Sequence, residues 1–205
     1  MSNKKIILPS TYFAPIAYYS ILFKNSNCVI DIHENFIKQS IRNRTTIFST
    51  NGSLNLTIPK LRKNSSNAII KDIKISYAEP WQKIHWKTII TCYNSSPFFK
   101  FYRDKFEVIY SKKEKYLIDF NFKTLSLIFE IFNTKKNIVL SDKYDTNYLS
   151  DFRNCSFLTD ENIFYDQVFS DNHGFISNLS IIDLLFNLGP ESLDTINRID
   201  ISKIY

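Results

Sequence analysis

Two short apolar runs near the N-terminus constrain the fold more than any other feature of the sequence. Residues Ile6 to Leu8 form the first run, which stops at Pro9, and Cys28 to Ile32 form the second. The aromatic-rich segment 15–23 lies between them. Short apolar runs that end at a proline or at polar residues are typical of strands, so this pattern predicts a strand, a helix and a second strand.

Further strands are expected in the next part of the chain. The dipeptide Asn51-Gly52 lies between the apolar segments 46–48 and 54–58, and Asn-Gly most easily adopts the two positive φ values of a type I′ turn. We therefore expect a hairpin that Pro59 closes. The segment Ile69 to Ile75 alternates at its end and predicts another strand, and residues 137–140 predict one more.

The hydrophobic period becomes helical from Glu79 onward. Pro80 suits a first helical turn, and apolar side chains then recur every three or four residues until Asn94. Segments 98–110 and 114–132 predict two further helices. Between residues 141 and 178 we expect loops, a short helix near Tyr148 and a strand over 165–169.

The most clearly delimited element is a helix beginning after Ser180. Ser180 and Asp183 have the spacing of a capping box, Gly189 can take the left-handed conformation that ends a helix, and Pro190 prevents continuation. The expected capping role explains why the polar Asp183 stands on this otherwise apolar helix. Asn187 lies on the same helix face, where we expect it to hold a loop such as His173-Gly174 or to contact a ligand.

These elements predict an α/β fold, with a mixed α+β arrangement as the alternative. We expect a single domain over residues 1–205, with a small sheet, an N-terminal hairpin and a helical central and C-terminal part. A chain of 205 residues with 44% hydrophobic residues can bury a core. Its 3 glycines and 6 prolines exclude a flexible or low-complexity protein.

The net charge of +6 is unevenly distributed. Residues 1–105 carry 16 Lys and Arg against 5 Asp and Glu, whereas residues 106–205 carry 10 against 15. Abundant Lys, Ile and Asn are typical of an AT-rich genome, and no zinc-finger or RNP signature accompanies the charge. We therefore expect no nucleic-acid partner, but a small anionic ligand on the basic half.

The cysteines and the N-terminus indicate the compartment. Three widely spaced cysteines are typical of free thiols in a reducing environment. The uncharged stretch 6–23 is similar to a signal peptide, but Pro9 and Pro15 interrupt it and no small-residue cleavage site follows. We expect a cytoplasmic protein without a membrane span.

The densest polar segment follows the second predicted strand, where open α/β sheets bind their ligands. His33 and Glu34 are candidates for general acid–base catalysis, and the two arginines of the segment suit a phosphate or carboxylate. The segment's candidate ligand-binding residues are Asn35, Lys38, Gln39, Arg42, Asn43 and Arg44. The alternative is a solvated loop with no function.

Other candidates are spread along the chain. His85 follows Trp81 by four residues on the helix face expected to be buried, so it is either a core histidine or a third catalytic residue. Asn94, Ser95 and His173 are further candidates for ligand binding. The three histidines have no metal-binding spacing, and 3 glycines cannot build a glycine-rich phosphate loop. We therefore expect neither a metal nor a cofactor.

A series of short strings spread over nearly the whole chain carries a family resemblance. The strings are 8–10, 12–15, 33–39, 42–44, 51–52, 56–59, 81–86, 93–99, 119–121, 173–175 and 179–190. Read in order, they resemble the WbqC-like family in the form met in Bacteroidetes-type bacteria. One departure is Leu8-Pro9, where the wider family favours Gln-Pro.

The resemblance implies a bacterial cytoplasmic protein associated with gene sets for surface polysaccharide (O-antigen). We therefore expect a transferase or ligase-like enzyme acting on an anionic amino-sugar nucleotide or an acyl-activated intermediate. Lys38, Arg42 and Arg44 would bind the anion, and His33, Glu34 and His85 would transfer protons. The alternative is a non-catalytic protein that binds or scaffolds an anionic ligand or a protein partner.

Overall fold

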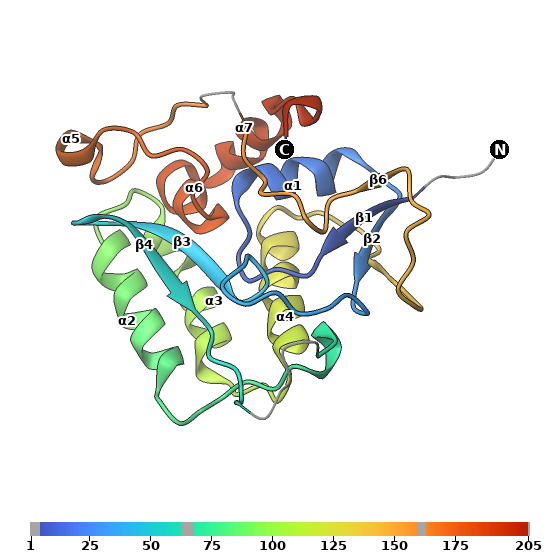
Figure 1. Ribbon diagram of the computed structural model, residues 1–205. Helices are drawn as coiled ribbons and strands as arrows, with labels where there is room; N and C mark the ends of the chain where they lie inside the picture. Colours follow the sequence, from blue (N-terminus) through green and yellow to red (C-terminus); the bar gives the residue numbers. More distant parts are fainter. Residues whose placement is uncertain (1–4, 63–67, 160–162, 205) are drawn as a thin grey trace.

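The computed structural model describes residues 5–62, 68–159 and 163–204 (Figure 1). In chain order the elements are β1 (Ile6–Pro9), α1 (Ile16–Lys24), β2 (Cys28–Asp31), β3 (Arg44–Ser49), β4 (Gly52–Thr57), the 3₁₀ helix η1 (Ile70–Asp72), α2 (Trp81–Tyr93), α3 (Phe99–Ser111), α4 (Leu117–Ile131), β5 (Val139–Leu140), β6 (Ser150–Asp151), α5 (Ser170–His173), α6 (Ile181–Leu188), η2 (Gly189–Glu191), α7 (Ser192–Arg198) and η3 (Ile201–Lys203). The mixture confirms the predicted α/β class.

The first sheet is parallel and has the strand order β5-β2-β1-β6. Its central strands β1 and β2 are buried along their whole length, which explains why their sequences are apolar rather than alternating. The chain passes from β1 through α1 to β2, but β6 lies on the other side of β1. A parallel sheet binds its ligands outside the carboxyl ends of the strands at such a change of direction.

The second sheet is the predicted hairpin of β3 and β4. Its turn is one residue earlier than expected, since Ser49 pairs with Gly52 and Thr50 and Asn51 form the loop. Neither loop residue has a positive φ, whereas Gly52 has a φ of 92°. The type I′ prediction was therefore wrong. Glycine takes the left-handed position after the loop, and the Ser49 hydroxyl donates a hydrogen bond to the Gly52 carbonyl.

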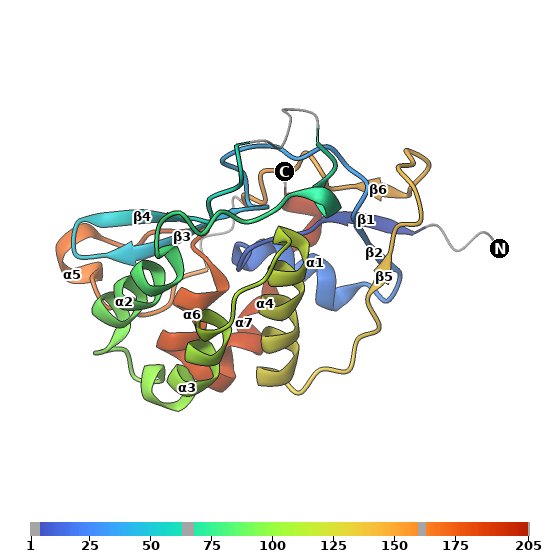
Figure 2. The same ribbon diagram turned by 90° about the horizontal axis from the view of Figure 1, so that it is seen from below.

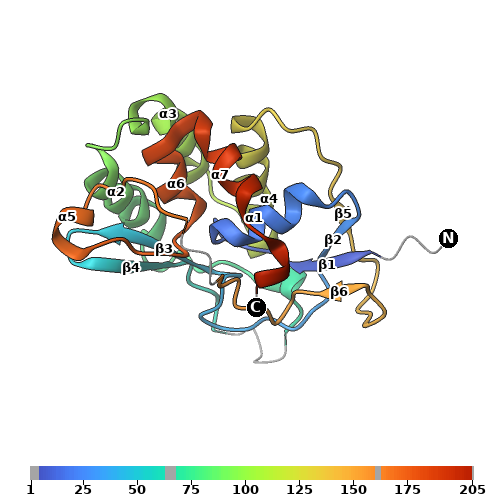
Figure 3. The same cartoon turned by 90° about the horizontal axis from the view of Figure 1, so that it is seen from above.

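The main helices cover one side of both sheets (Figures 2 and 3). Phe186 of α6 lies at the centre of this layer, with its ring 4.9–5.2 Å from those of Tyr93, Phe99 and Phe106. Within the described residues, no helix combines the length and the hydropathy needed to cross a membrane.

Helix α6 begins after Ser180 and ends at Gly189, as predicted, but Asp183 is not part of the cap. The Ser180 hydroxyl alone accepts a hydrogen bond from the Ile182 N–H. The buried Asp183 carboxylate accepts hydrogen bonds from the hydroxyls of Tyr93 (2.8 Å) and Tyr165 (2.6 Å) and from the Gln167 amide (3.1 Å), because a buried carboxylate needs donors. Burial raises the pKa of Asp183.

Three other local predictions were wrong. The segment 69–75 forms η1 and isolated bridges instead of a strand, because its buried Ile70 and Ile73 are spaced by three residues, as in a 3₁₀ helix. Among the described residues, 163–169 form no strand, and Tyr148 precedes the short strand β6 instead of lying in a helix. The strand expected over 137–140 is confirmed as β5.

Candidate functional site

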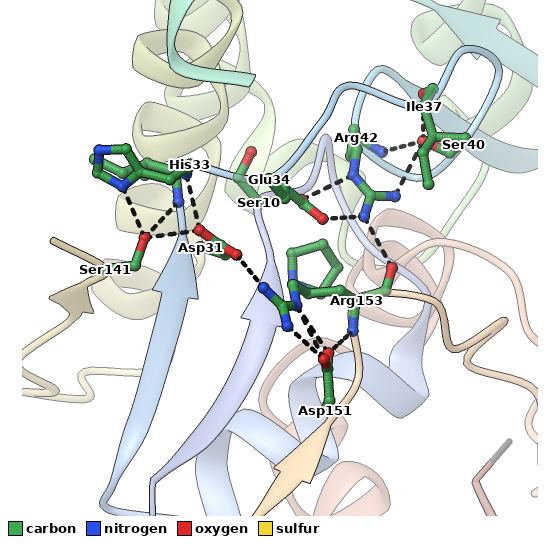
Figure 4. A network of polar contacts seen from close by, with 12 residues as sticks. Ser10, Asp31, His33, Glu34, Ile37, Ser40, Arg42, Ser141, Asp151 and Arg153 are labelled. Atoms are coloured by element: carbon green, nitrogen blue, oxygen red, sulfur yellow. Dashed lines mark hydrogen bonds and ion pairs between the residues drawn. The ribbon is translucent and has the colours of Figure 1, made fainter. Parts of the chain in front are cut away.

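Polar side chains gather at the carboxyl ends of the four parallel strands (Figure 4). Ser10 follows β1, Asp31 is the last residue of β2, Ser141 follows β5, and Arg153 lies two residues after β6. With His33, Glu34, Arg42 and Asp151, and with Asn121 bridging Ser10 to Arg42, these residues form a connected set, called here the strand-end network. It occupies the edge at which the sheet topology predicts a ligand.

Asp31 lies at the centre of the strand-end network and is fully buried. One carboxylate oxygen, Oδ2, accepts a hydrogen bond from Arg153 Nη1 at 2.6 Å. The other, Oδ1, accepts from Ser141 Oγ at 2.7 Å and from the His33 main-chain N–H at 2.8 Å. A single carboxylate therefore orients an arginine on one side and a serine–histidine pair on the other.

These contacts fix the tautomer of His33. Ser141 Oγ donates its single proton to Asp31, so it can only accept from its other partners. It accepts from the Ile32 N–H at 3.1 Å, and it lies 3.1 Å from His33 Nδ1. Nδ1 must therefore carry the proton, and Nε2 of the neutral imidazole keeps its lone pair. The side chain is partly buried and is suited to act as a base.

The Arg153 guanidinium is fixed by contacts with acidic and aromatic side chains. It is 4% exposed and bonds to Asp151 through Nε (2.9 Å) and Nη2 (2.5 Å). Its guanidinium carbon lies 4.4 Å from the ring centroid of Tyr144, a cation–π geometry. The hydrogen bonds from Arg153 lower the pKa of Asp151.

Glu34 and Arg42 form a second buried ion pair. Arg42 Nε donates to Glu34 Oε1 at 2.8 Å, and Arg42 Nη2 donates to the other oxygen and to the main-chain carbonyl of Arg153 at 2.8 Å. Burial raises the pKa of Glu34, and the hydrogen bonds from Arg42 oppose that shift. These two predicted site residues are therefore each other's partners, and neither is left free for a ligand.

A pocket of about 380 Å³ lies beside this ion pair and is called here the Arg44 pocket. Its lining comprises Ile37, residues 39–42, Arg44, Thr46 and residues 153–156. Arg44 Nε donates to the Thr57 hydroxyl at 3.1 Å, and among the described residues Arg44 forms no ion pair. The pocket thus combines a cation free to bind an anion with the two arginines of the strand-end network.

Five predicted residues of segment 33–44 lie outside this lining: His33, Glu34, Asn35, Lys38 and Asn43. Asn35 and Lys38 are exposed. Asn43 is buried, and its amide donates to the Ile58 carbonyl at 2.9 Å, which joins the segment to the end of β4. Gln39, which has a φ of 56°, does line the Arg44 pocket.

His85 lies in the aromatic core, apart from His33. Its ring donates to the main chain of Thr57, so Nδ1 is an acceptor and receives the Tyr12 hydroxyl at 3.1 Å. Tyr12 in turn receives the Tyr110 hydroxyl at 2.6 Å. Burial lowers the pKa of His85 to about 4, which keeps it neutral at pH 7. The expectation of a buried histidine is confirmed, and its partners satisfy both ring nitrogens.

The remaining candidates are not brought to the strand ends. His173 is exposed on α5 and donates from Nε2 to the Thr50 carbonyl at 2.7 Å. The Asn187 amide donates to the Asp183 carbonyl of its own helix, so it does not hold the His173 loop. Asn94 and Ser95 are exposed after the end of α2. Across residues 5–62, 68–159 and 163–204, no three His, Cys, Asp or Glu side chains are placed to hold a metal ion.

Sequence reasoning missed Ser141, Arg153 and Asn121 as members of this region. Asn121 of α4 donates to Ser10 Oγ at 3.0 Å and to the Arg42 carbonyl at 2.8 Å. Ser141 directly follows the predicted strand 137–140, so the rule that singled out His33 applied to it as well. Arg153 follows a strand of two polar residues that no hydrophobic pattern reveals.

The comparisons with known proteins identify the family. The model of the WbqC-like protein family matches residues 10–159. The chain belongs to the WbqC-like protein family. The matched segment contains the whole strand-end network and the Arg44 pocket, whereas His173 and Asn187 of the WbqC-like chain lie outside it. Neither a curated protein nor a solved structure matches the chain.

Proposed function

We propose that this WbqC-like protein binds a small anionic molecule in the Arg44 pocket and acts on it with His33 as the base. Its substrate would be an amino-sugar nucleotide or an acyl-activated intermediate of bacterial surface-polysaccharide biosynthesis, which makes it a transferase or ligase-like enzyme. Family membership supports this setting. The free Cys28, Cys92 and Cys155 agree with a reducing cytoplasm.

The double role of Asp31 is the observation that carries this proposal. Through Oδ2 it fixes Arg153, which lines the Arg44 pocket, and through Oδ1 it fixes Ser141 and thereby the tautomer of His33. His33 does not line the Arg44 pocket itself, but Asp31 connects it to Arg153, which does. Group transfer from an activated donor requires a base that is held rigidly in this way.

The chemistry assigned to His33 is proton transfer. As the amine of the sugar attacks the activated acyl carbon, a C–N bond forms and the bond from that carbon to the oxygen or sulfur of its carrier breaks. His33 Nε2 accepts the proton that the amine loses, and the carrier leaves with the electron pair. Arg44 neutralises the phosphate groups of the bound donor or acceptor.

A non-catalytic binding or scaffold protein is the second candidate, and one specific observation favours it. Two of the three side chains expected to transfer protons are already satisfied, since Glu34 binds Arg42 and His85 binds Tyr12 and Thr57. A protein that only recognises an anion needs the Arg44 pocket but not the Nε2 lone pair of His33.

The variant His33→Asn distinguishes the two candidates. The amide nitrogen of the new asparagine can replace Nδ1–H as the donor to Ser141, but asparagine has no basic nitrogen in place of Nε2. We would screen uridine and thymidine diphosphate amino sugars and acyl-coenzyme A thioesters by thermal shift, and follow product formation by mass spectrometry. A ligand at 100 times its Kd adds about 2.7 kcal/mol to the free energy of unfolding. The enzyme proposal expects H33N to keep the thermal shift and lose the product, whereas unchanged turnover by H33N would refute it.

A further inference from the structure

We propose that a second pocket, which shares no lining residue with the strand-end network, binds a neutral sugar ring. It has a volume of about 460 Å³ and lies where the first turn of α2 meets the last turns of α3. The volume is within the range of small-molecule sites, roughly 300–1,000 Å³. No residue lines both this pocket and the Arg44 pocket, so the inference does not depend on the proposed function.

Four aromatic residues give this aromatic pocket its walls: Tyr77, Trp81, Trp86 and Tyr110. The half-buried Trp86 ring stacks on Tyr110 with a centroid distance of 5.8 Å and an interplanar angle of 19°. The Tyr77 hydroxyl donates to the Glu114 carbonyl and accepts from the Glu114 N–H, which fixes that ring. The flat faces are therefore held in place before any ligand binds, which lowers the entropic cost of binding.

The pocket also contains hydrogen-bond donors without acceptors. Trp81, one of the lining residues, is 3% exposed, and its indole Nε1 is buried without a hydrogen-bond partner among the described residues. Pro80 at the start of α2 provides no side-chain cap, and within the described chain the main-chain N–H groups of Gln82 and Lys83 have no acceptor. Donors without acceptors are costly, so a ligand whose hydroxyl oxygens accept from these main-chain N–H groups would stabilise this end of the pocket.

The charges around the opening cancel. Glu79 and Glu107 oppose Lys83 and Lys113, all four side chains are exposed, and none of them forms an ion pair with another described residue. Two carboxylates disfavour a phosphate or a nucleotide, and two ammonium groups disfavour a cation. The balance selects a ligand that is polar but uncharged.

A pyranose ring matches these three features together. Its C–H groups present an apolar face that packs on an aromatic ring, and its hydroxyls both donate and accept hydrogen bonds. Carboxylates would accept from those hydroxyls, and the main-chain and ammonium N–H groups would donate to them. A purely apolar ligand would leave the donors unsatisfied, and a nucleobase arriving with its phosphates would meet the two carboxylates.

The two tryptophans of the chain make a direct test possible. Because Trp81 and Trp86 are the only tryptophans and both line this pocket, intrinsic tryptophan fluorescence reports on it alone. We would titrate the full chain with methyl glycosides of glucose, galactose and N-acetylglucosamine, and separately with uridine monophosphate and with glycerol. The variants would be Glu107→Gln and Trp86→Phe, and the control Phe101→Ala, which removes an exposed ring of α3 outside the pocket.

We expect a saturable fluorescence change with at least one methyl glycoside and none with glycerol. Glu107→Gln removes a charged acceptor and should raise the Kd by about tenfold, whereas Phe101→Ala should leave it unchanged. Trp86→Phe keeps Trp81 as the reporter and should weaken binding as well. The proposal is overturned by saturation with uridine monophosphate alone, by a glycoside response that Glu107→Gln and Trp86→Phe leave intact, or by no response to any glycoside.

Discussion

Asp31 and Arg153 are 122 residues apart in the chain, yet their side chains meet at 2.6 Å in the interior of the protein. The contact joins the end of β2 to the residue that follows β6, and β1 lies between those strands in the sheet. Both side chains are almost fully buried, so each charge depends on the other for its solvation. This pair is therefore the point at which the sheet and the candidate site are stabilised together.

The first prediction concerns that pair. Arg153→Met should lower the free energy of unfolding by about 3–5 kcal/mol, because it leaves the buried Asp31 carboxylate without a counter-charge. The double variant Asp31→Asn, Arg153→Met should recover part of the loss. Lys105→Met, which breaks the exposed pair with Glu130, is the control and should cost less than about 1 kcal/mol. Urea unfolding measures all three, and equal losses for R153M and K105M would contradict the burial argument.

The tautomer of His33 gives a second prediction. At a pH where the imidazole is neutral, Nδ1 should carry the proton and Nε2 should be bare, because Ser141 can only accept from the ring. Two-bond proton–nitrogen correlation spectra distinguish the two nitrogens. Ser141→Ala removes the acceptor and should shift the population toward the Nε2–H tautomer. A wild-type ring protonated mainly on Nε2 would mean that Asp31 does not fix the imidazole.

His85 predicts how stability depends on pH. Its pKa is lowered to about 4 in the folded protein, against about 6.5 in an unfolded chain. Between these values the unfolded state binds the additional proton, so the free energy of unfolding falls as the pH decreases from 6.5 toward 4, by roughly 3 kcal/mol. His85→Gln should be less stable at pH 7 but should lose this part of the pH dependence. Urea unfolding of both proteins from pH 7 to pH 4 measures the difference, and parallel curves would contradict the assignment.

Gly189 provides a prediction about the end of α6. Its φ is 56°, and a Cβ placed there would lie 2.3 Å from the Phe98 ring. Gly189→Ala should therefore cost more than about 2 kcal/mol, since it adds a steric clash to the strain of a left-handed residue. Gly174→Ala is the matched control, because its φ is also positive, at 70°, but its Cβ would meet no atom within 4 Å. Thermal unfolding compares the two, and equal losses would show that the clash is relieved.

The sequence predicts those parts of the site that follow strong hydrophobic patterns. The run Cys28 to Ile32 places His33 at a strand end, and the four-residue spacing from Trp81 places His85 on a buried face. Residues whose positions depend on weak elements escape such reasoning. Strand β6 has only two residues, and it pairs with β1 because the apolar Ile6 and Ile7 offer it a free edge.

The other differences between the sequence predictions and the structure concern polar side chains and their partners. Segment 33–44 reads as a set of free charges, but Glu34 and Arg42 neutralise each other once the loop is buried. Asp183 fits the pattern of a cap, but two tyrosine hydroxyls and the Gln167 amide, all from other parts of the chain, donate to its carboxylate. Such pairings depend on tertiary contacts between distant residues, which no local spacing encodes.

The affinity of the Arg44 pocket for a phosphate group tests the proposed function most directly. We would titrate inorganic pyrophosphate into the wild-type protein, Arg44→Gln and Lys38→Gln by isothermal titration calorimetry at constant ionic strength. Lys38 is the matched control, since it is an exposed cation of the same segment outside the pocket lining. We expect R44Q to weaken binding by about tenfold or more, the loss of one charge-assisted hydrogen bond, and K38Q to leave it nearly unchanged. No measurable binding to the wild type, or equal weakening by both variants, would contradict an anion site at Arg44.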